Sequence, residues 1–242
     1  MLCSSSMSHL VKYLANLGYG TRREVTRLVA HGRVTDARGS ALHDDARYEH
    51  DDVRVDAAPL DPPPGSVVLL HKPVGYVCST TDATNPVVYE LLPPRFRART
   101  PLMAPVGRLD VDTTGLLLLT DDGALNHRLT SPRSHVPKRY VATLAEPLRG
   151  DEGARFASGT VQLASDPEPL APATLEVLDA HTVRVTLVEG RYHQVRRMFA
   201  ALGNHVLQLQ RISIGGLTVA DEPVGSWRLL SAAERDLLFL SP

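Results

Sequence analysis

Cysteine is almost absent from this sequence, since Cys3 and Cys78 are the only two among 242 residues. Two thiols are too few for the disulfide frameworks that hold small secreted domains together. Neither cysteine shows metal-ligand spacing with any of the ten histidines. We therefore expect reduced thiols and no bound metal.

Long apolar runs are missing as well. No stretch approaches the roughly 20 residues that a membrane-spanning helix needs. Met1 to Ser8 lacks the basic start and long apolar centre of a secretory signal. With 43% hydrophobic and 22% charged residues, the chain is long enough for one large or two unequal domains. We expect a soluble cytoplasmic monomer that makes no membrane contact.

The net charge of −1 argues at first against a nucleic-acid binder. The charges are segregated, however: acids predominate over residues 39–60, whereas two other stretches are basic. The first basic stretch holds Lys12, Arg22, Arg23, Arg27, Arg33 and Arg38, and the second holds Arg128, Arg133, Lys138 and Arg139. Such patches suit phosphate contact, although chance clustering on solvated faces remains the alternative for each patch alone.

A proline-rich stretch at residues 57–66 divides the chain. Pro62-Pro63-Pro64 favours an extended, semi-rigid spacer that continues neither a helix nor a central strand. We therefore expect an N-terminal domain over residues 1–56 and a larger domain over residues 67–242.

The N-terminal domain has the pattern of two helices and a short strand. Leu10, Leu14 and Leu17 mark one helix face that ends near Gly18, and Thr21 with Glu24 forms the capping-box pattern of a second helix. The outer face of that second helix carries Arg22, Arg23 and Arg27, and Gly32-Arg33-Val34 turns into a strand.

In the larger domain, Asp110 lies in a tight turn that precedes a buried strand. Leu116 to Leu119 form an unbroken apolar run closed by Thr120-Asp121-Asp122-Gly123, and Gly115 permits close backbone approach. Taken alone, this motif is better explained if Asp110 caps the turn or pairs with Arg108 than if it is functional.

Further elements follow from periodicity. We expect strands over residues 67–70, 139–144 and 206–214, and a short helix over residues 86–92 that Pro93-Pro94 ends. A helix over residues 193–202 buries the stripe Val195, Met198, Phe199 and Leu202. Arg197 falls opposite this stripe and should face solvent or RNA. Arg196 falls on its flank and is the cation expected to approach Asp110.

Five blocks of the larger domain carry a family resemblance. They are KPVGYVCST (72–80), GRLDVDTTGL (107–116), TDDG (120–123), KRY (138–140) and EGRYHQVRRMF (189–199). In type and order they resemble the RsuA-type branch of ribosomal RNA pseudouridine synthases, and the N-terminal helices resemble the S4-type RNA-binding module often fused to it. The resemblance implies an α+β fold, in which the S4-like module precedes a mixed, largely antiparallel sheet flanked by helices.

The resemblance also implies a mechanism without cofactor or metal. Asp110 would act at the sugar C1′, as nucleophile or as base, two routes that the sequence leaves open. Arg196 would face it, and Tyr140 would stack on the flipped uracil. RNA contact is implied for Arg108, Lys12, Arg22, Arg23, Arg27, Arg33, Arg128, Lys138, Arg139, Arg191, His193, Gln194 and Arg197.

The blocks at 76–80 and 189–205 look closest to enzymes that act on small-subunit (16S) rRNA, of the position-516 type. Three alternatives stay open. The substrate could be large-subunit (23S) rRNA, or the chain could be a non-catalytic RNA-binding assembly factor on the same scaffold. A third and weaker interpretation takes Asp110 and Asp112 as the acid/base pair of a hydrolase.

Overall fold

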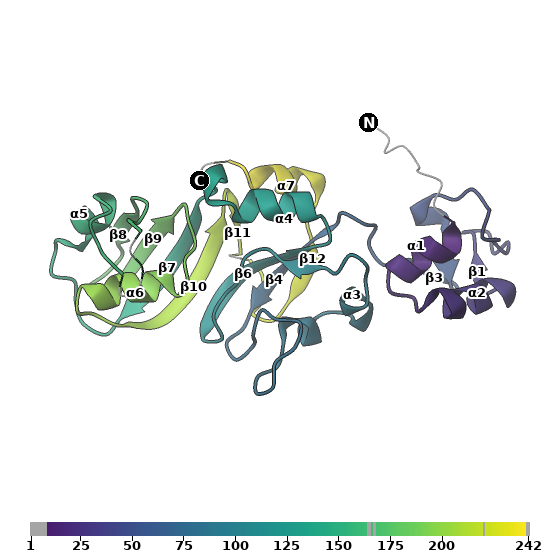
Figure 1. Ribbon diagram of the computed structural model, residues 1–242, viewed down its shortest axis with the longest axis horizontal. Helices are drawn as coiled ribbons and strands as arrows, with labels where there is room; N and C mark the ends of the chain where they lie inside the picture. Colours follow the sequence, from purple (N-terminus) through teal and green to yellow (C-terminus); the bar gives the residue numbers. More distant parts are fainter. Residues whose placement is uncertain (1–8, 164–165, 167, 220, 241–242) are drawn as a thin grey trace.

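The computed structural model describes residues 9–163, 166, 168–219 and 221–240. Cys3 and the Met1 to Ser8 segment lie outside these residues. The expectations of a reduced thiol at Cys3 and of no secretory signal rest on them. Figure 1 shows a small module at one end of the molecule and a larger domain built on a twisted sheet with helices on its faces. The expected α+β class is confirmed.

The N-terminal module contains α1 (Leu10–Asn16), α2 (Arg22–Ala30) and a three-stranded antiparallel sheet of β1 (Val34–Thr35), β2 (Arg54–Val55) and β3 (Ala58–Pro59). A 3₁₀ helix, η1 (His50–Asp52), precedes β2. The expected capping box is present, because Thr21 accepts from the Glu24 backbone while the Glu24 carboxylate accepts from the Thr21 backbone.

The stretch expected to be a linker carries structure of its own. β3 lies within it and pairs with β2, so the small sheet continues to residue 59. Asp61 accepts hydrogen bonds from Arg95, and its backbone N–H donates to the Tyr19 hydroxyl. Arg99, fully buried, pairs with Asp121 at 3.6 Å and donates to a linker carbonyl. These bonds attach the segment to both parts of the chain.

The larger domain is organised around a nine-stranded sheet of order β12-β4-β6-β10-β7-β9-β8, to which β5 and β11 attach at β6 and β10. Its only parallel pair is β6 with β10 among the described strands, so the expectation of a mixed, largely antiparallel sheet is confirmed. The strands are β4 (Val67–Lys72), β5 (Ala104–Pro105), β6 (Thr113–Thr120), β7 (Lys138–Leu144), β8 (Thr174–Val177), β9 (Thr182–Leu187), β10 (Val206–Ile214), β11 (Leu217–Thr218) and β12 (Trp227–Leu229).

Helices cover this sheet on both faces (Figure 1). The larger domain also contains two short 3₁₀ helices, η2 (Val88–Leu91) and η3 (Pro132–Ser134). The α-helices are α3 (Pro94–Arg97), α4 (Gly123–Thr130), α5 (Glu152–Ala157), α6 (Gln194–Ala201) and α7 (Ala232–Leu237).

The leucine run forms the centre of β6, as expected. Leu116 and Leu118 pack into a cluster with Leu129 of α4 and Leu238 beside α7. Leu117 and its neighbour Leu119 pack on the opposite face in a cluster formed largely by residues 87–103. Because successive strand side chains point to opposite faces, a strand covered on both sides needs an unbroken apolar run.

One expected helix is wrong in its boundaries. Residues 86–92 contain the 3₁₀ helix η2. Pro94, which was expected only to end that helix, begins the next one, α3. Proline is tolerated at the first helical position because that N–H has no intrahelical partner to lose.

Gly115 is required by close strand packing. Its φ is +113°, and an added Cβ would lie 2.2 Å from the carbonyl oxygen of Arg211 in the parallel neighbour β10. That distance is far below van der Waals contact with backbone, which cannot rotate away. Gly115 therefore permits the β6–β10 pairing that brings the Asp110 turn beside the rest of the sheet.

We predict that Gly115→Ala lowers the free energy of unfolding by about 2–5 kcal/mol, through left-handed strain and overpacking together. Urea denaturation measures the change. Gly153→Ala, in α5, is the matched control, since no atom lies within 4 Å of its added Cβ; it should leave stability unchanged or slightly raised. Equal stability of the wild type and Gly115→Ala would contradict the packing described here.

Candidate functional site

A cleft lies beside the turn that precedes β6. Its volume of about 410 Å³ falls within the roughly 300–1,000 Å³ typical of ligand sites. We call it the Asp110 cleft. Its lining comes from the turn before β6, from β7 and β10, and from the loop before α6, and includes Arg108, Asp110, Lys138, Tyr140, Tyr192, His193 and Arg211.

The Asp110 turn is held by a buried lysine. Lys72, at the end of β4, has no exposed surface, and its Nζ donates to the carbonyl oxygens of Pro73, Asp110 and Thr113 at 3.0, 3.0 and 2.8 Å. An ammonium group has three donors, and all three are used. Burial lowers the pKa of Lys72. Lys72 thus holds the backbone at Asp110 and at Thr113, the first residue of β6.

The Asp110 carboxylate is partly desolvated, and its side chain is 25% exposed. Burial raises its pKa above 3.8, whereas His193, Arg196 and Lys72 act in the opposite direction. The nearest basic side chain is that of His193, whose Nε2 lies 3.2 Å from Oδ1 of Asp110.

The expectation that Arg196 pairs directly with Asp110 is wrong in detail. Arg196 forms its ion pair with Asp112 at 2.9 Å and donates to the Val206 carbonyl oxygen. The buried stripe of α6 did predict that Arg196 points toward the Asp110 turn. In that turn, however, Asp112 is the carboxylate that Arg196 contacts. His193, the N-cap residue of α6, takes the position beside Asp110 instead.

Tyr140 lies where it was expected. It is half-buried on β7, directly across from Arg211 of β10, and it lines the same cleft as Asp110. The structure therefore brings Asp110 and Tyr140 into one cavity, whereas Arg196 and its partner Asp112 are not among the described residues that line it.

The candidate RNA contacts of the cleft differ in exposure. Arg108 is exposed on the rim, and Arg139 is half-buried on β7. Lys138 also lines the cleft, where burial lowers its pKa to about 8. Arg128 of α4 is exposed, with its guanidinium 3.6 Å from the centre of the Phe239 ring.

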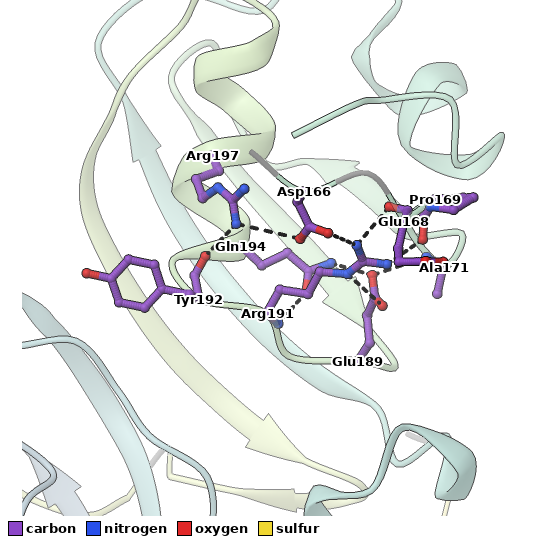
Figure 2. A network of polar contacts seen from close by, with 9 residues as sticks. All are labelled: Asp166, Glu168, Pro169, Ala171, Glu189, Arg191, Tyr192, Gln194 and Arg197. Atoms are coloured by element: carbon purple, nitrogen blue, oxygen red, sulfur yellow. Dashed lines mark hydrogen bonds and ion pairs between the residues drawn. The ribbon is translucent and has the colours of Figure 1, made fainter. Parts of the chain in front are cut away.

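Two expected RNA contacts, Arg191 and Gln194, turn inward (Figure 2). Arg191 pairs with Asp166 at 2.9 Å and Glu189 at 3.3 Å, and donates to backbone carbonyls of the 168–169 segment. Gln194 is buried, donates to Glu189 at 2.7 Å and accepts from the Arg191 backbone. Both residues therefore fasten the loop before α6, and Arg191 also lines the Asp110 cleft.

Arg197, which was expected to face solvent or RNA, is held by two contacts. It lies 3.8 Å from Asp166 and donates to the Tyr192 carbonyl oxygen at 3.2 Å. Its side chain is only 25% exposed.

In the N-terminal module, the side chains of Lys12, Arg22, Arg23 and Arg27 are exposed. Arg33 is exposed too, but it forms a two-pronged ion pair with Asp56 at 2.6 Å. Four of the five candidate cations of this module thus point into solvent without such a pair.

The sequence did not reveal the roles of Lys72 and His193. A signal existed for Lys72, since a charged residue closing an apolar strand needs hydrogen-bond partners when buried. For His193 there was none, because its position depends on a left-handed backbone (φ 50°, ψ 34°).

In the described ranges, no group of three His, Cys, Asp or Glu side chains is arranged to hold a metal ion. Within the same ranges, no helix has both the length and the apolar character needed to cross a bilayer.

Comparison with known proteins gives consistent matches. A family model described as RNA pseudouridylate synthase matches residues 66–201. The chain is 48% identical over 188 residues to the ribosomal small subunit pseudouridine synthase A of Escherichia coli K12, covering 77% of this chain and 79% of that protein. The identity to the protein of the same name from Yersinia pestis is 46% over 187 residues, covering 76% and 77%.

A solved structure agrees with the same assignment. The crystal structure of a pseudouridylate synthase is 37% identical, has a TM-score of 0.68, and covers 95% of this chain and 99% of that chain. The family match, the sequence identity and the shared fold all apply to the domain that contains the Asp110 cleft, and this chain therefore belongs to the RNA pseudouridylate synthase family.

Proposed function

We propose that this enzyme isomerises a specific uridine of 16S rRNA, of the position-516 type, to pseudouridine. The main supporting observation is the partly desolvated carboxylate of Asp110, which lies in a nucleotide-sized cleft beside Tyr140 and whose backbone carbonyl accepts a hydrogen bond from Lys72. The small-subunit substrate is supported by the relatives of this chain that are 46–48% identical to it, because they are named ribosomal small subunit pseudouridine synthase A.

The reaction requires no net redox change. The bond between C1′ and N1 breaks, the uracil rotates while bound, and C5 forms the new bond to C1′ as its proton leaves. Asp110 acts at the sugar, either by attacking C1′ or by removing a sugar proton, and both routes need its ionised form. His193 and Arg196 favour that form electrostatically.

The other cleft residues bind the nucleotide. Tyr140 stacks on the extruded uracil and assists removal of the C5 proton. Arg108, exposed on the rim, contacts the RNA backbone and helps the uridine leave its stack. Lys138 and Arg139 extend this basic rim along β7.

We propose an S4-like RNA-binding role for the N-terminal module, which we assign to residues 1–56, with residues 57–66 joining it to the catalytic domain at 67–242. Its exposed cations Lys12, Arg22, Arg23 and Arg27 contact RNA phosphates. The bonds from Asp61 and Arg99 hold the module close to the catalytic domain.

Asp110→Asn should reduce tritium release from 16S rRNA labelled at uridine C5 by at least about 1,000-fold, because an amide neither attacks C1′ nor removes a proton. Circular dichroism and RNA binding should match the wild type. Asp151→Asn is the matched control, since Asp151 is 63% exposed and is not among the residues that line the cleft; it should retain most activity. Substantial activity in Asp110→Asn would exclude Asp110 as the catalytic carboxylate.

Arg196→Ala and Arg197→Ala should have different kinetic effects. Loss of Arg196 removes a cation that favours the Asp110 carboxylate, so kcat should fall about 100-fold, with partial recovery in Arg196→Lys. Loss of Arg197 loosens the loop before α6 and should chiefly raise KM. Steady-state kinetics separates the two, and equal losses of kcat would contradict these assignments.

The triple variant Arg22→Ala, Arg23→Ala and Arg27→Ala should weaken RNA binding and lower the slope of log Kd against log salt concentration by about 2. Activity at saturating RNA should be unchanged. Arg33→Ala is the control, since Asp56 already pairs with its guanidinium, and it should alter the slope little. An unchanged slope in the triple variant would show that α2 does not contact phosphates.

A further inference from the structure

Tyr192 is the most exposed large apolar side chain among the residues that the structure describes, at 69%. A single exposed aromatic ring is ordinary on a protein surface. This ring, however, lines the Asp110 cleft together with Arg108 and His193. The position, more than the exposure, requires an explanation.

The backbone that carries Tyr192 is fixed on both sides. Arg191 and Gln194 are anchored to the Glu189 carboxylate, and Arg197 donates to the carbonyl oxygen of Tyr192 itself at 3.2 Å. In Figure 2 the Tyr192 ring points away from this polar network. A ring presented by a fixed backbone loses little conformational entropy when it binds a ligand.

One face of the ring is already stacked. The Tyr192 and His193 rings have their centroids 3.8 Å apart and an interplanar angle of 18°. His193 in turn lies 3.2 Å from the Asp110 carboxylate. The two rings therefore form a short stack that extends from the catalytic carboxylate to the surface, and the exposure of Tyr192 leaves its outer part open.

We propose that Tyr192 is an RNA-binding residue whose ring stacks on the nucleobase adjacent to the extruded uridine. This inference rests on the proposed function, because it places the uridine itself at Tyr140. An unpaired base beside an extruded nucleotide has a free face, and aromatic stacking stabilises such bases irrespective of sequence. Arg191 and Gln194 hold the loop that presents Tyr192.

The test compares Tyr192→Ala, Tyr192→Phe and Leu207→Ala in the full-length enzyme, with tritium-labelled 16S rRNA as the probe. Leu207 is the control because it is 64% exposed and lies on β10. Tyr192→Ala should raise both Kd and KM by about 5- to 100-fold, with kcat and melting temperature nearly unchanged. Tyr192→Phe and Leu207→Ala should behave as the wild type.

Salt dependence adds a readout that separates stacking from charge. Because stacking neutralises no phosphate, Tyr192→Ala should weaken binding without changing the slope of log Kd against log salt concentration, whereas Arg108→Ala should lower it. The inference is overturned if Tyr192→Ala binds RNA within twofold of the wild type, or if Tyr192→Phe loses as much affinity. Failure of the proposed function appears differently, as a wild-type enzyme that releases no tritium; the Kd comparison still tests Tyr192 in that case.

Discussion

The three hydrogen bonds of the Lys72 ammonium group hold the catalytic end of this molecule together. A cation without exposed surface is tolerated only when its donors are satisfied. Here the acceptors are the backbone carbonyls of Pro73, which follows β4, of Asp110, and of Thr113, which begins β6. The same bonds that satisfy Lys72 also fix the Asp110 turn. Gly115, the third residue of β6, lets β10 approach the start of β6. The backbone of the turn therefore determines the position of the Asp110 carboxylate, independently of the side chains that line the cleft.

The electrostatics of the cleft follow from this placement. Fixing Asp110 at a partly buried position disfavours its ionised form, which the proposed reaction requires. His193, Arg196 and Lys72 oppose that effect from three different elements, namely the α6 N-cap, α6 itself and β4. The Arg191 network anchors the loop that carries His193, so residues without any contact to Asp110 still contribute to its environment.

The elements that the sequence predicted well are those governed by local patterns. The leucine run reports a strand covered on both faces, the Thr21 and Glu24 pair defines a helix start, and the spacing of Val195, Met198 and Phe199 defines the buried side of α6. Family resemblance, rather than pattern, singled out Asp110 and Tyr140. What was missed depends on tertiary partners. Nothing local reveals that Arg191 also pairs with Asp166, which lies 25 residues earlier in the chain. The choice of Arg196 between Asp110 and Asp112 likewise depends on a turn conformation that periodicity does not encode.

The central claim is that Asp110 is the carboxylate that converts one uridine of small-subunit rRNA. The most direct measurement maps pseudouridines in 16S and 23S rRNA from cells that lack this gene and carry either the wild-type or the Asp110→Asn protein. The account predicts that one 16S pseudouridine disappears with the gene and returns with the wild type alone. Its return with Asp110→Asn, or loss of a 23S pseudouridine with 16S unchanged, would contradict the account.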